Sequence, residues 1–214
     1  MRRSGLAGCV LAVGLAMAAG TAAAQCVTAE SLATGVQFTR QQGQQGWVQS
    51  AGGDRVQVDY IVGREGYREA VLLQGGVYPI QYVDLSAPPD VIGVWSNTQT
   101  AIQVSGRPPV PVPGGEWSTT IRIRVTGDDF SGRLIDDRYR LEGVYRFLAE
   151  EVVTLSGCQY RMIPVELTMR NENGAAMERS VYFPDLGFAI RTQRTNLGNG
   201  SVTTNGLTAM RPAG

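Results

Sequence analysis

Asp54-Arg55-Val56-Gln57-Val58-Asp59-Tyr60 is the stretch of sequence that decides the fold. Val56, Val58 and Tyr60 are apolar, and polar residues separate them. Successive side chains of a β-strand point to opposite faces, so this period of two predicts a half-buried strand. The preceding Ala51-Gly52-Gly53 predicts a turn, which makes the stretch the second strand of a hairpin.

The same strand signals recur along most of the chain, and no segment has a convincing helical period. Residues 28–33 predict one short helical turn. Residues 107–115 contain four prolines and predict an extended surface connection, with a Pro-rich recognition tract as the alternative. The other expected strands cover residues 36–40, 47–50, 70–73, 76–83, 91–95, 117–126, 137–140, 143–148, 152–155, 157–169, 177–183 and 188–195. We expect an all-β fold with little helix: a single antiparallel sheet, strongly curved into a half-barrel or barrel-like shape.

The first residues have the layout of a secretory signal peptide. Arg2 and Arg3 precede an apolar run at 5–20, and Ala22-Ala23-Ala24 matches a cleavage site ending at Ala24. We therefore expect an exported protein with three parts. These are a cleaved signal peptide at 1–24, an antiparallel β-domain at 25–195 and a flexible C-terminal tail at 196–214, rich in Gly, Asn and Thr.

Two other interpretations of the leader fit less well. Leu6-Ala7-Gly8-Cys9 has the letters of a lipobox, but the apolar run continues beyond Cys9, whereas a lipobox ends the apolar run. A retained anchor would need about 20 apolar residues, and this run has roughly 15. We expect no transmembrane anchor after cleavage.

Cleavage would leave two cysteines, Cys26 and Cys158. An even pair in an oxidising compartment predicts one disulfide, which would enclose roughly 130 residues. Two free thiols are the alternative. A catalytic cysteine is disfavoured because the chain offers no histidine to activate it.

The composition excludes many kinds of catalysis. The chain contains no His, and all 19 of its basic residues are Arg, so it has no Lys. Ser–His or Cys–His nucleophiles, imidazole metal ligands and Schiff-base lysines are therefore excluded. We expect a protein that is not an enzyme and has no cofactor and no metal site, with a carboxylate-pair hydrolase as the remaining catalytic alternative. Loss of Arg2 and Arg3 would leave a slightly acidic chain, which disfavours nucleic acid as a partner.

Charged residues on the expected strands have two possible roles. The acidic pairs Asp128-Asp129, Asp136-Asp137 and Glu150-Glu151 lack the spacing of a calcium loop, and neighbours on a strand point to opposite faces, so we expect solvated acids. The arginines on neighbouring strands are Arg122, Arg124, Arg138, Arg140, Arg146 and Arg161. Cross-strand pairing with acids is the favoured interpretation, and a surface for phospholipid headgroups or acidic glycans is the alternative.

Large apolar residues on the strands would pack in a core, or line a lipid-sized cavity if one side of a curved sheet is uncovered. The candidate ligand-binding residues are Trp47, Val56, Val58, Tyr60, Leu73 and Tyr82.

Several of these strands resemble a known family. Phe38-Thr39-Arg40, Gly46-Trp47-Val48, residues 54–60 and Tyr82-Val83-Asp84 resemble the opening strands of LolA/LolB-like periplasmic lipoprotein carriers. Residues 158–165 and 182–187 are similar to the closing hairpin of related envelope β-proteins. The resemblance implies an antiparallel half-barrel with an apolar concave face, although the helices that cover the cavity mouth in those carriers are not evident here.

Together these features predict a monomeric protein of a Gram-negative periplasm without enzymatic activity. We expect it to bind a lipid, a lipoprotein or another apolar envelope ligand. A structural or interaction protein of the envelope is the alternative, working through an exposed strand edge or the arginine-rich strands.

Overall fold

The computed structural model describes residues 25–62, 67–85, 97–128 and 133–213. The expected signal peptide at 1–24, the expected strand at 91–95 and Asp129 lie outside the described residues. Most of the described chain is β-strand, and the only helical segments within it are two short 3-10 helices, η1 (Ala29–Ala33) and η2 (Gln41–Gly43). The first of these confirms the helical turn expected at 28–33.

The described part of the chain contains 14 strands. They are β1 (Val36–Arg40), β2 (Gln45–Ser50), β3 (Arg55–Val62), β4 (Tyr67–Gln74), β5 (Tyr78–Leu85), β6 (Asn97–Val104), β7 (Glu116–Asp128), β8 (Leu134–Phe147), β9 (Glu151–Leu155), β10 (Cys158–Asn171), β11 (Gly174–Phe183), β12 (Phe188–Asn196), β13 (Val202–Thr204) and β14 (Leu207–Pro212). The proline-rich residues 107–115 connect β6 to β7 outside the ladder, as expected.

All strand pairs are antiparallel and belong to one sheet. Its order is β13-β12-β11-β10-β8-β7-β6-β5-β4-β3-β2-β1-β14, and β9 pairs with the first part of β10. This confirms the predicted all-β class and the single antiparallel sheet. The sheet is not closed, because its path ends at β13 on one side and at β14 on the other.

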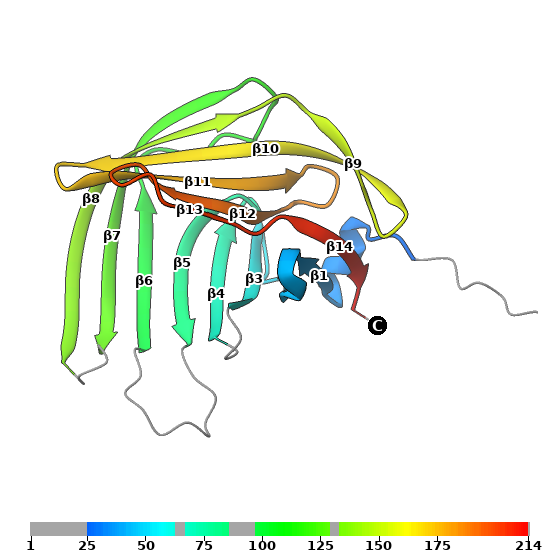
Figure 1. The fold of residues 1–214 in the computed structure, drawn as a ribbon, viewed down its shortest axis with the longest axis horizontal. Coiled ribbons are helices and arrows are strands. Elements are labelled where there is room, and N and C mark those ends of the chain that lie inside the picture. The colour runs from blue at the N-terminus through cyan, green and yellow to red at the C-terminus, as the bar shows by residue number, and fades with distance from the viewer. Residues whose placement is uncertain (1–24, 63–66, 86–96, 129–132, 214) are drawn as a thin grey trace, which may run out of the picture.

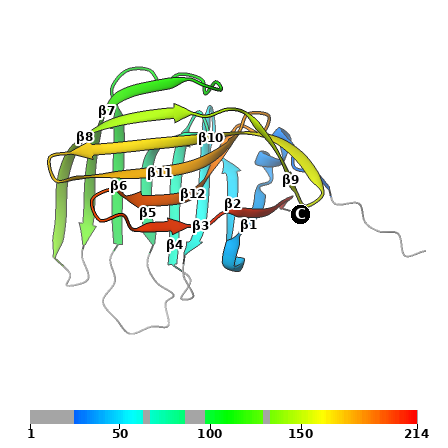
Figure 2. The ribbon, with the colours of Figure 1, turned by 45° about the horizontal axis from the view of Figure 1, so that its top comes forward.

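The sheet has two limbs that cross (Figure 1). One limb contains β3 to β8, which run side by side. The other contains β10 to β12, which run across the upper parts of the first; the turned view agrees (Figure 2). We call the face of β3 to β8 that carries Val58 and Tyr60 the inner face, and the opposite face the outer face. Residues directly paired across neighbouring strands share a face, so the register extends this definition from β3 to β8.

The chain end differs from the flexible tail expected at 196–214, because it contains the two short strands β13 and β14, of 3 and 6 residues. Phe38 of β1 lies opposite Met210 of β14, and only 1% of Met210 is exposed. The Gly- and Asn-rich composition reflects the turns around these short strands. Burial of Met210 in the core gives the last segment a reason to order that its composition does not show.

The core has two clusters between the limbs. In the first, Phe38 and Val58 are fully buried with apolar residues of β12 and β14. Gly46 lies beside Phe38, and a side chain there would overlap the phenyl ring. In the second, Ile121 and Tyr145 pack against apolar residues of β10.

The predicted disulfide between Cys26 and Cys158 is present, with a Cα–Cα distance of 5.7 Å. It fixes the segment before η1 to the start of β10. Next to it, the backbone N–H of Val27 donates to the hydroxyl of Tyr160 at 2.9 Å. The N-terminal end of the described chain is thus attached to the late strands by one covalent bond and one buried hydrogen bond.

Candidate functional site

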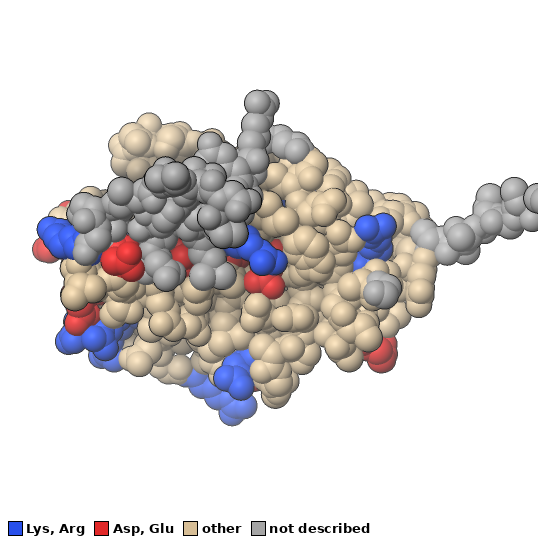
Figure 3. All heavy atoms as spheres, turned by 90° about the horizontal axis from the view of Figure 1, so that it is seen from below, with Lys and Arg blue, Asp and Glu red and all other residues tan. Residues whose placement is uncertain are grey.

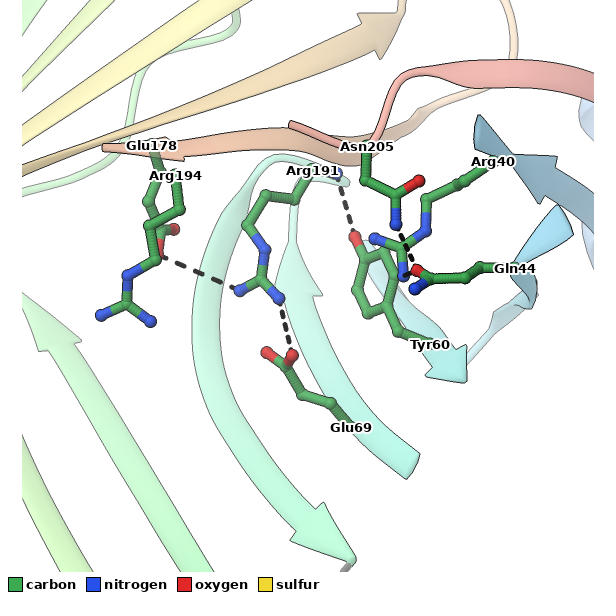
Figure 4. Close-up of polar contacts among 8 residues, drawn as sticks. All are labelled: Arg40, Gln44, Tyr60, Glu69, Glu178, Arg191, Arg194 and Asn205. Atoms are coloured by element: carbon green, nitrogen blue, oxygen red, sulfur yellow. Dashed lines mark hydrogen bonds and ion pairs between the residues drawn. The ribbon is translucent and has the colours of Figure 1, made fainter. Parts of the chain in front are cut away.

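Charged side chains meet inside the molecule, where the two limbs face each other (Figure 4). We call this group the interior charged cluster. It consists of Arg40 of β1, Tyr60 of β3, Glu69 of β4, Glu178 of β11 and Arg191 of β12. Burying charge is costly unless it is paired, so a cluster in this position needs a physical account.

The strand register explains how these residues converge. Tyr60 lies directly opposite Glu69, so both project from the inner face of β3 and β4. In the other limb the pairing of β11 with β12 shifts, so that Arg179 pairs with Gln193 while Ser180 pairs with Arg191. This bulge leaves Thr192 without a pairing partner in the β11–β12 register, and bulges of this kind re-aim neighbouring side chains.

The positive charge of Arg191 is balanced by carboxylates from both limbs. Its Nη2 lies 2.6 Å from Oε2 of Glu69, and its Nη1 lies 4.0 Å from Oε1 of Glu178. Glu178 also approaches Arg194, with 3.7 Å between Oε1 and Nε. Burial alone would lower the pKa of Arg191, but the two carboxylates outweigh it and raise that pKa. Arg191 therefore stays charged and joins β12 to β4.

Tyr60 lies between two guanidinium groups. The Cζ atoms of Arg40 and Arg191 are 4.7 Å and 5.3 Å from the centroid of its ring, within the range of cation–π attraction. Its hydroxyl accepts a hydrogen bond from the backbone N–H of Arg191 at 3.0 Å. Burial raises the pKa of Tyr60, and it raises that of the neighbouring Tyr82 as well. Both phenols are therefore neutral at ordinary pH.

Arg40 is the cation of the cluster that has no carboxylate partner among the described residues. Only 5% of it is exposed, and its Nη2 donates to Oε1 of Gln44 at 3.0 Å. The same oxygen accepts from Nδ2 of Asn205. Nε of Arg40 and Oδ1 of Asn205 are buried and have no hydrogen-bond partner in the part of the chain that the structure describes. Burial lowers the pKa of Arg40, so this site holds positive charge at a cost.

Five of the six predicted ligand-binding residues share the inner face, and the sixth does not. Val56, Val58, Tyr60 and Leu73 are buried in the first core cluster, and Tyr82 packs against it. Trp47 is directly paired with Asp59 and lies on the outer face, half-buried. The inward positions of β2 are Gly46 and Val48, so alternation places Trp47 on the other side.

The inner face becomes less covered along β7 and β8. Ile121 is 2% exposed, whereas Ile123 and Val125, the next inner positions of β7, are half-buried. On β8, Leu141 is half-buried and Tyr139 is 45% exposed. We call these four residues (Ile123, Val125, Tyr139 and Leu141) the open part of the inner face. Figure 3 shows the molecule from below, with basic and acidic side chains scattered among uncharged ones.

Of two neighbouring cross-strand rows of the inner face, one reaches this open part and the other starts in the interior charged cluster. One row runs from Val71 through Tyr82 and Thr100 to Val125. The next row begins at Tyr60 and Glu69, then passes through Asp84 and Thr98 to Gly127. Burial first and then the nearby Glu69 raise the pKa of Asp84. The inner face therefore offers apolar and acidic groups side by side.

The expected pairing of arginines with acids is confirmed for several of them. Arg124 binds Asp136 with Nε–Oδ1 at 2.8 Å, and Arg146 binds Glu116 at 2.9 Å. Arg161 binds Asp185 and lies 3.5 Å from Glu150. Two arginines of the predicted set, Arg122 and Arg140, make no ion pair within the described chain.

The acidic pair Asp136-Asp137 of β8 is not a spatial dyad. Asp136 is bound by Arg124, whereas Asp137, one position along β8, accepts from the hydroxyl of Tyr139 at 3.2 Å. The described residues contain no group of three or more Cys, Asp or Glu placed to hold a metal ion. Among these same residues, no helix has the length and apolarity to cross a membrane.

Sequence reasoning missed the members of the interior charged cluster other than Tyr60. A signal was present at Arg40, because Val36 and Phe38 set the inward phase of β1 and Arg40 continues it. No comparable signal marks Glu69 or Arg191, since 122 residues separate them. Comparison of the chain with protein-family models, curated proteins and solved structures yields no match.

Proposed function

We propose that the chain is an exported binding protein of the periplasm, without enzymatic activity, that holds an amphipathic, lipid-like ligand against the inner face of a half-barrel sheet. The observation that carries this proposal is the decline of burial along β7 and β8. Ile121 is closed off from solvent, while Ile123 and Tyr139 extend the same apolar face into a partly open region. Binding sites for small ligands typically combine an apolar wall with a few polar groups of this kind.

The neighbouring rows suggest how the ligand lies. Its apolar chain would follow Tyr82, Thr100 and Val125 across the strands, toward the open part of the inner face. Its polar end would lie toward Glu69, Asp84 and the interior charged cluster. A rigid sheet holds these groups at fixed spacing, which lowers the entropic cost of binding.

The charged residues of the cluster support a binding role over hydrolysis. A carboxylate-pair hydrolase needs two carboxyl groups free to act as acid and base or nucleophile. The carboxylates of Glu69 and Glu178 are instead engaged by Arg191, and Arg194 approaches the second of them. The chain has no histidine or lysine to take over proton transfer.

A pair of variants on one strand tests the proposal. Tyr139→Arg places a charge on the open part of the inner face, and Leu134→Arg places the same charge on the outer face of β8, where Leu134 is 86% exposed. Both proteins, and the parent, would be produced with export and titrated with a fluorescent monoacylglycerol, a single-chain lipid without charge. We expect Tyr139→Arg to raise the Kd by about tenfold or more, which means weaker binding, and Leu134→Arg to leave the Kd unchanged.

Native mass spectrometry of the exported parent protein supplies an independent reading. We expect a co-purified species of lipid mass, which organic extraction removes. Absence of such a species together with no binding of the monoacylglycerol would refute the proposal, as would an equal effect of the two variants.

A further inference from the structure

Four arginines form a two-by-two array on the outer face. Arg122 of β7 lies directly opposite Arg140 of β8, and Arg124 lies directly opposite Arg138. All four are exposed. Directly paired positions of antiparallel strands bring Cβ atoms to about 5 Å, and positions two apart on one strand are separated by about 7 Å. We call these residues the outer arginine array.

Two members of the array share one acid, and the other two make no ion pair within the described chain. Asp136 is bound by Arg124 and lies 3.8 Å from Nη2 of Arg138. Arg122 and Arg140 make no ion pair or hydrogen bond through their side chains with any described residue. Like charges directly opposite each other destabilise a sheet, so the pair Arg122 and Arg140 opposes folding. Because these charges destabilise the sheet, we expect them to have a role other than stability.

The surroundings of the array leave room for a ligand. A groove of about 590 Å³ lies over the array and over Ala101 and Gln103 of β6. A second groove of about 550 Å³ lies on the other side, between Arg138 and Arg140 and the end of β10 with the turn that follows it. Arg170 of β10 lines this groove together with Glu142 and Glu172. Arg138 and Arg140 line both grooves and separate them.

We propose that the outer arginine array binds a phosphate monoester group. A guanidinium has a planar set of N–H donors that matches two oxygens of a phosphate. Two guanidinium groups on opposite positions can therefore both donate to one tetrahedral phosphate. A phosphate monoester carries close to two negative charges near neutral pH, which matches the uncompensated pair Arg122 and Arg140. The positions beside the array on β6 are Ala101 and Gln103, so the outer face offers no aromatic ring there for base stacking, which disfavours single-stranded nucleic acid.

This site is separate from the proposed lipid site. The array alternates along β7 and β8 with Ile123 and Tyr139, which belong to the inner face. The two proposals can therefore be tested separately, and failure of one does not contradict the other. The phosphate monoester could belong to a lipid headgroup at a membrane surface or to a soluble molecule, and both present the same chemical group to the array.

Two double variants with the same change in charge test the proposal. Arg122→Gln with Arg140→Gln removes the unpaired arginines of the array. Arg146→Gln with Arg179→Gln removes two exposed arginines that are already paired, with Glu116 and Glu166. Each full-length exported protein would be titrated with phosphatidylcholine vesicles containing phosphatidic acid, and separately with glycerol 3-phosphate followed by NMR chemical shifts. Vesicles with phosphatidylglycerol in place of phosphatidic acid, at matched surface charge, complete the set.

We expect the parent protein and the Arg146/Arg179 variant to bind the monoester alike, and the Arg122/Arg140 variant to bind about tenfold more weakly or worse. Binding to phosphatidic acid vesicles alone identifies a lipid headgroup, and binding to glycerol 3-phosphate as well identifies a soluble ligand; either result supports the proposal. Absence of binding to both, equal binding to phosphatidylglycerol vesicles, or an equal loss in both variants would overturn it. Far-UV circular dichroism of each variant verifies that the sheet is intact.

Discussion

Tyr60 and Arg191 meet twice across the interior of the molecule. The guanidinium of Arg191 lies over the Tyr60 ring, 5.3 Å from its centroid, and the backbone N–H of Arg191 donates to the Tyr60 hydroxyl at 3.0 Å. The two residues are 131 positions apart, on β3 and β12. Their contact joins the two limbs of the sheet by a polar link in a largely apolar interior.

Tyr60→Phe isolates the hydrogen-bonded part of this link. The ring and its contacts with the guanidinium groups remain, but the N–H of Arg191 loses its acceptor in a buried site. We expect the free energy of unfolding to fall by about 1–3 kcal/mol, measured by urea denaturation. Tyr139→Phe is the matched control, since Tyr139 is 45% exposed and water can replace its bond to Asp137. Equal effects of the two variants would contradict a structural role for the Tyr60 hydroxyl.

The ion pair between Arg191 and Glu69 should be worth more than an exposed one. Both side chains are 20% exposed, whereas those of Arg146 and Glu116 are 60% and 54% exposed. A double-mutant cycle with Arg191→Met and Glu69→Gln is expected to give a coupling energy of about 1–3 kcal/mol. The same cycle on Arg146 and Glu116 should give less than about 1 kcal/mol. A coupling as small in the interior as on the surface would show that solvent reaches the cluster.

The pH dependence of stability should be flat near neutrality and fall at both extremes. The chain has no His and no Lys, and both cysteines of the β-domain are in the disulfide. The α-amino group is therefore the group of this domain whose ordinary pKa lies between about 7 and 9. Burial raises the pKa of Tyr60 and Tyr82. Groups with a raised pKa in the folded state stabilise it fully below their unfolded value, about 10, and this contribution is lost as pH rises further.

At acid pH the sign is reversed. Hydrogen bonds from Arg161 and Arg124 lower the pKa of Asp185 and Asp136, so their contribution is present above the unfolded value, about 4, and is lost as pH falls below it. Urea midpoints from pH 3 to 11, with tyrosinate absorbance at the alkaline end, measure both limits. A marked slope between pH 7 and 9 would disagree with this account.

The sequence was most informative where each strand keeps one face in the core. Alternation such as Val56, Val58, Tyr60 depends only on local periodicity, so the all-β class, the antiparallel sheet and the β10–β11 hairpin could be predicted. The pairing of β14 with β1 could not, because it depends on Met210 reaching Phe38 across most of the chain. The Gly- and Asn-rich composition of residues 196–214 indicated turns, but it did not indicate the short strands between them.

The candidate site was harder to predict for the same reason. Tyr60 was identified because it continues an apolar row, and Arg40 could have been, since it continues the inward phase of Phe38. Glu69 and Arg191 come together only through the crossing of the limbs and the bulge at Thr192. No local pattern encodes that geometry.

Loss of the disulfide should weaken the fold without changing its topology. Cys26 and Cys158 are 132 positions apart, and a cross-link that closes a loop of this size restricts the unfolded chain strongly. The double variant Cys26→Ser, Cys158→Ser is expected to lose about 2–5 kcal/mol of unfolding free energy. The parent protein treated with reductant should match the double variant, and the variant itself should not respond to reductant. A stability that is the same with and without the cross-link would contradict the expectation.

Arg140→Gln should make the protein more stable, which is the opposite of what most substitutions do. The change removes one member of the directly opposed pair Arg122 and Arg140, neither of which makes an ion pair with a described residue, so the repulsion disappears and no salt bridge is lost. We expect a gain of about 0.2–1 kcal/mol at low ionic strength, seen as a raised Tm. Because both side chains are exposed, about 1 M salt should remove most of the gain. Arg146→Gln, which breaks the pair with Glu116, should show no gain. A loss of stability in Arg140→Gln would mean that the array is held by contacts other than charge, and it would remove the energetic argument for an external anion.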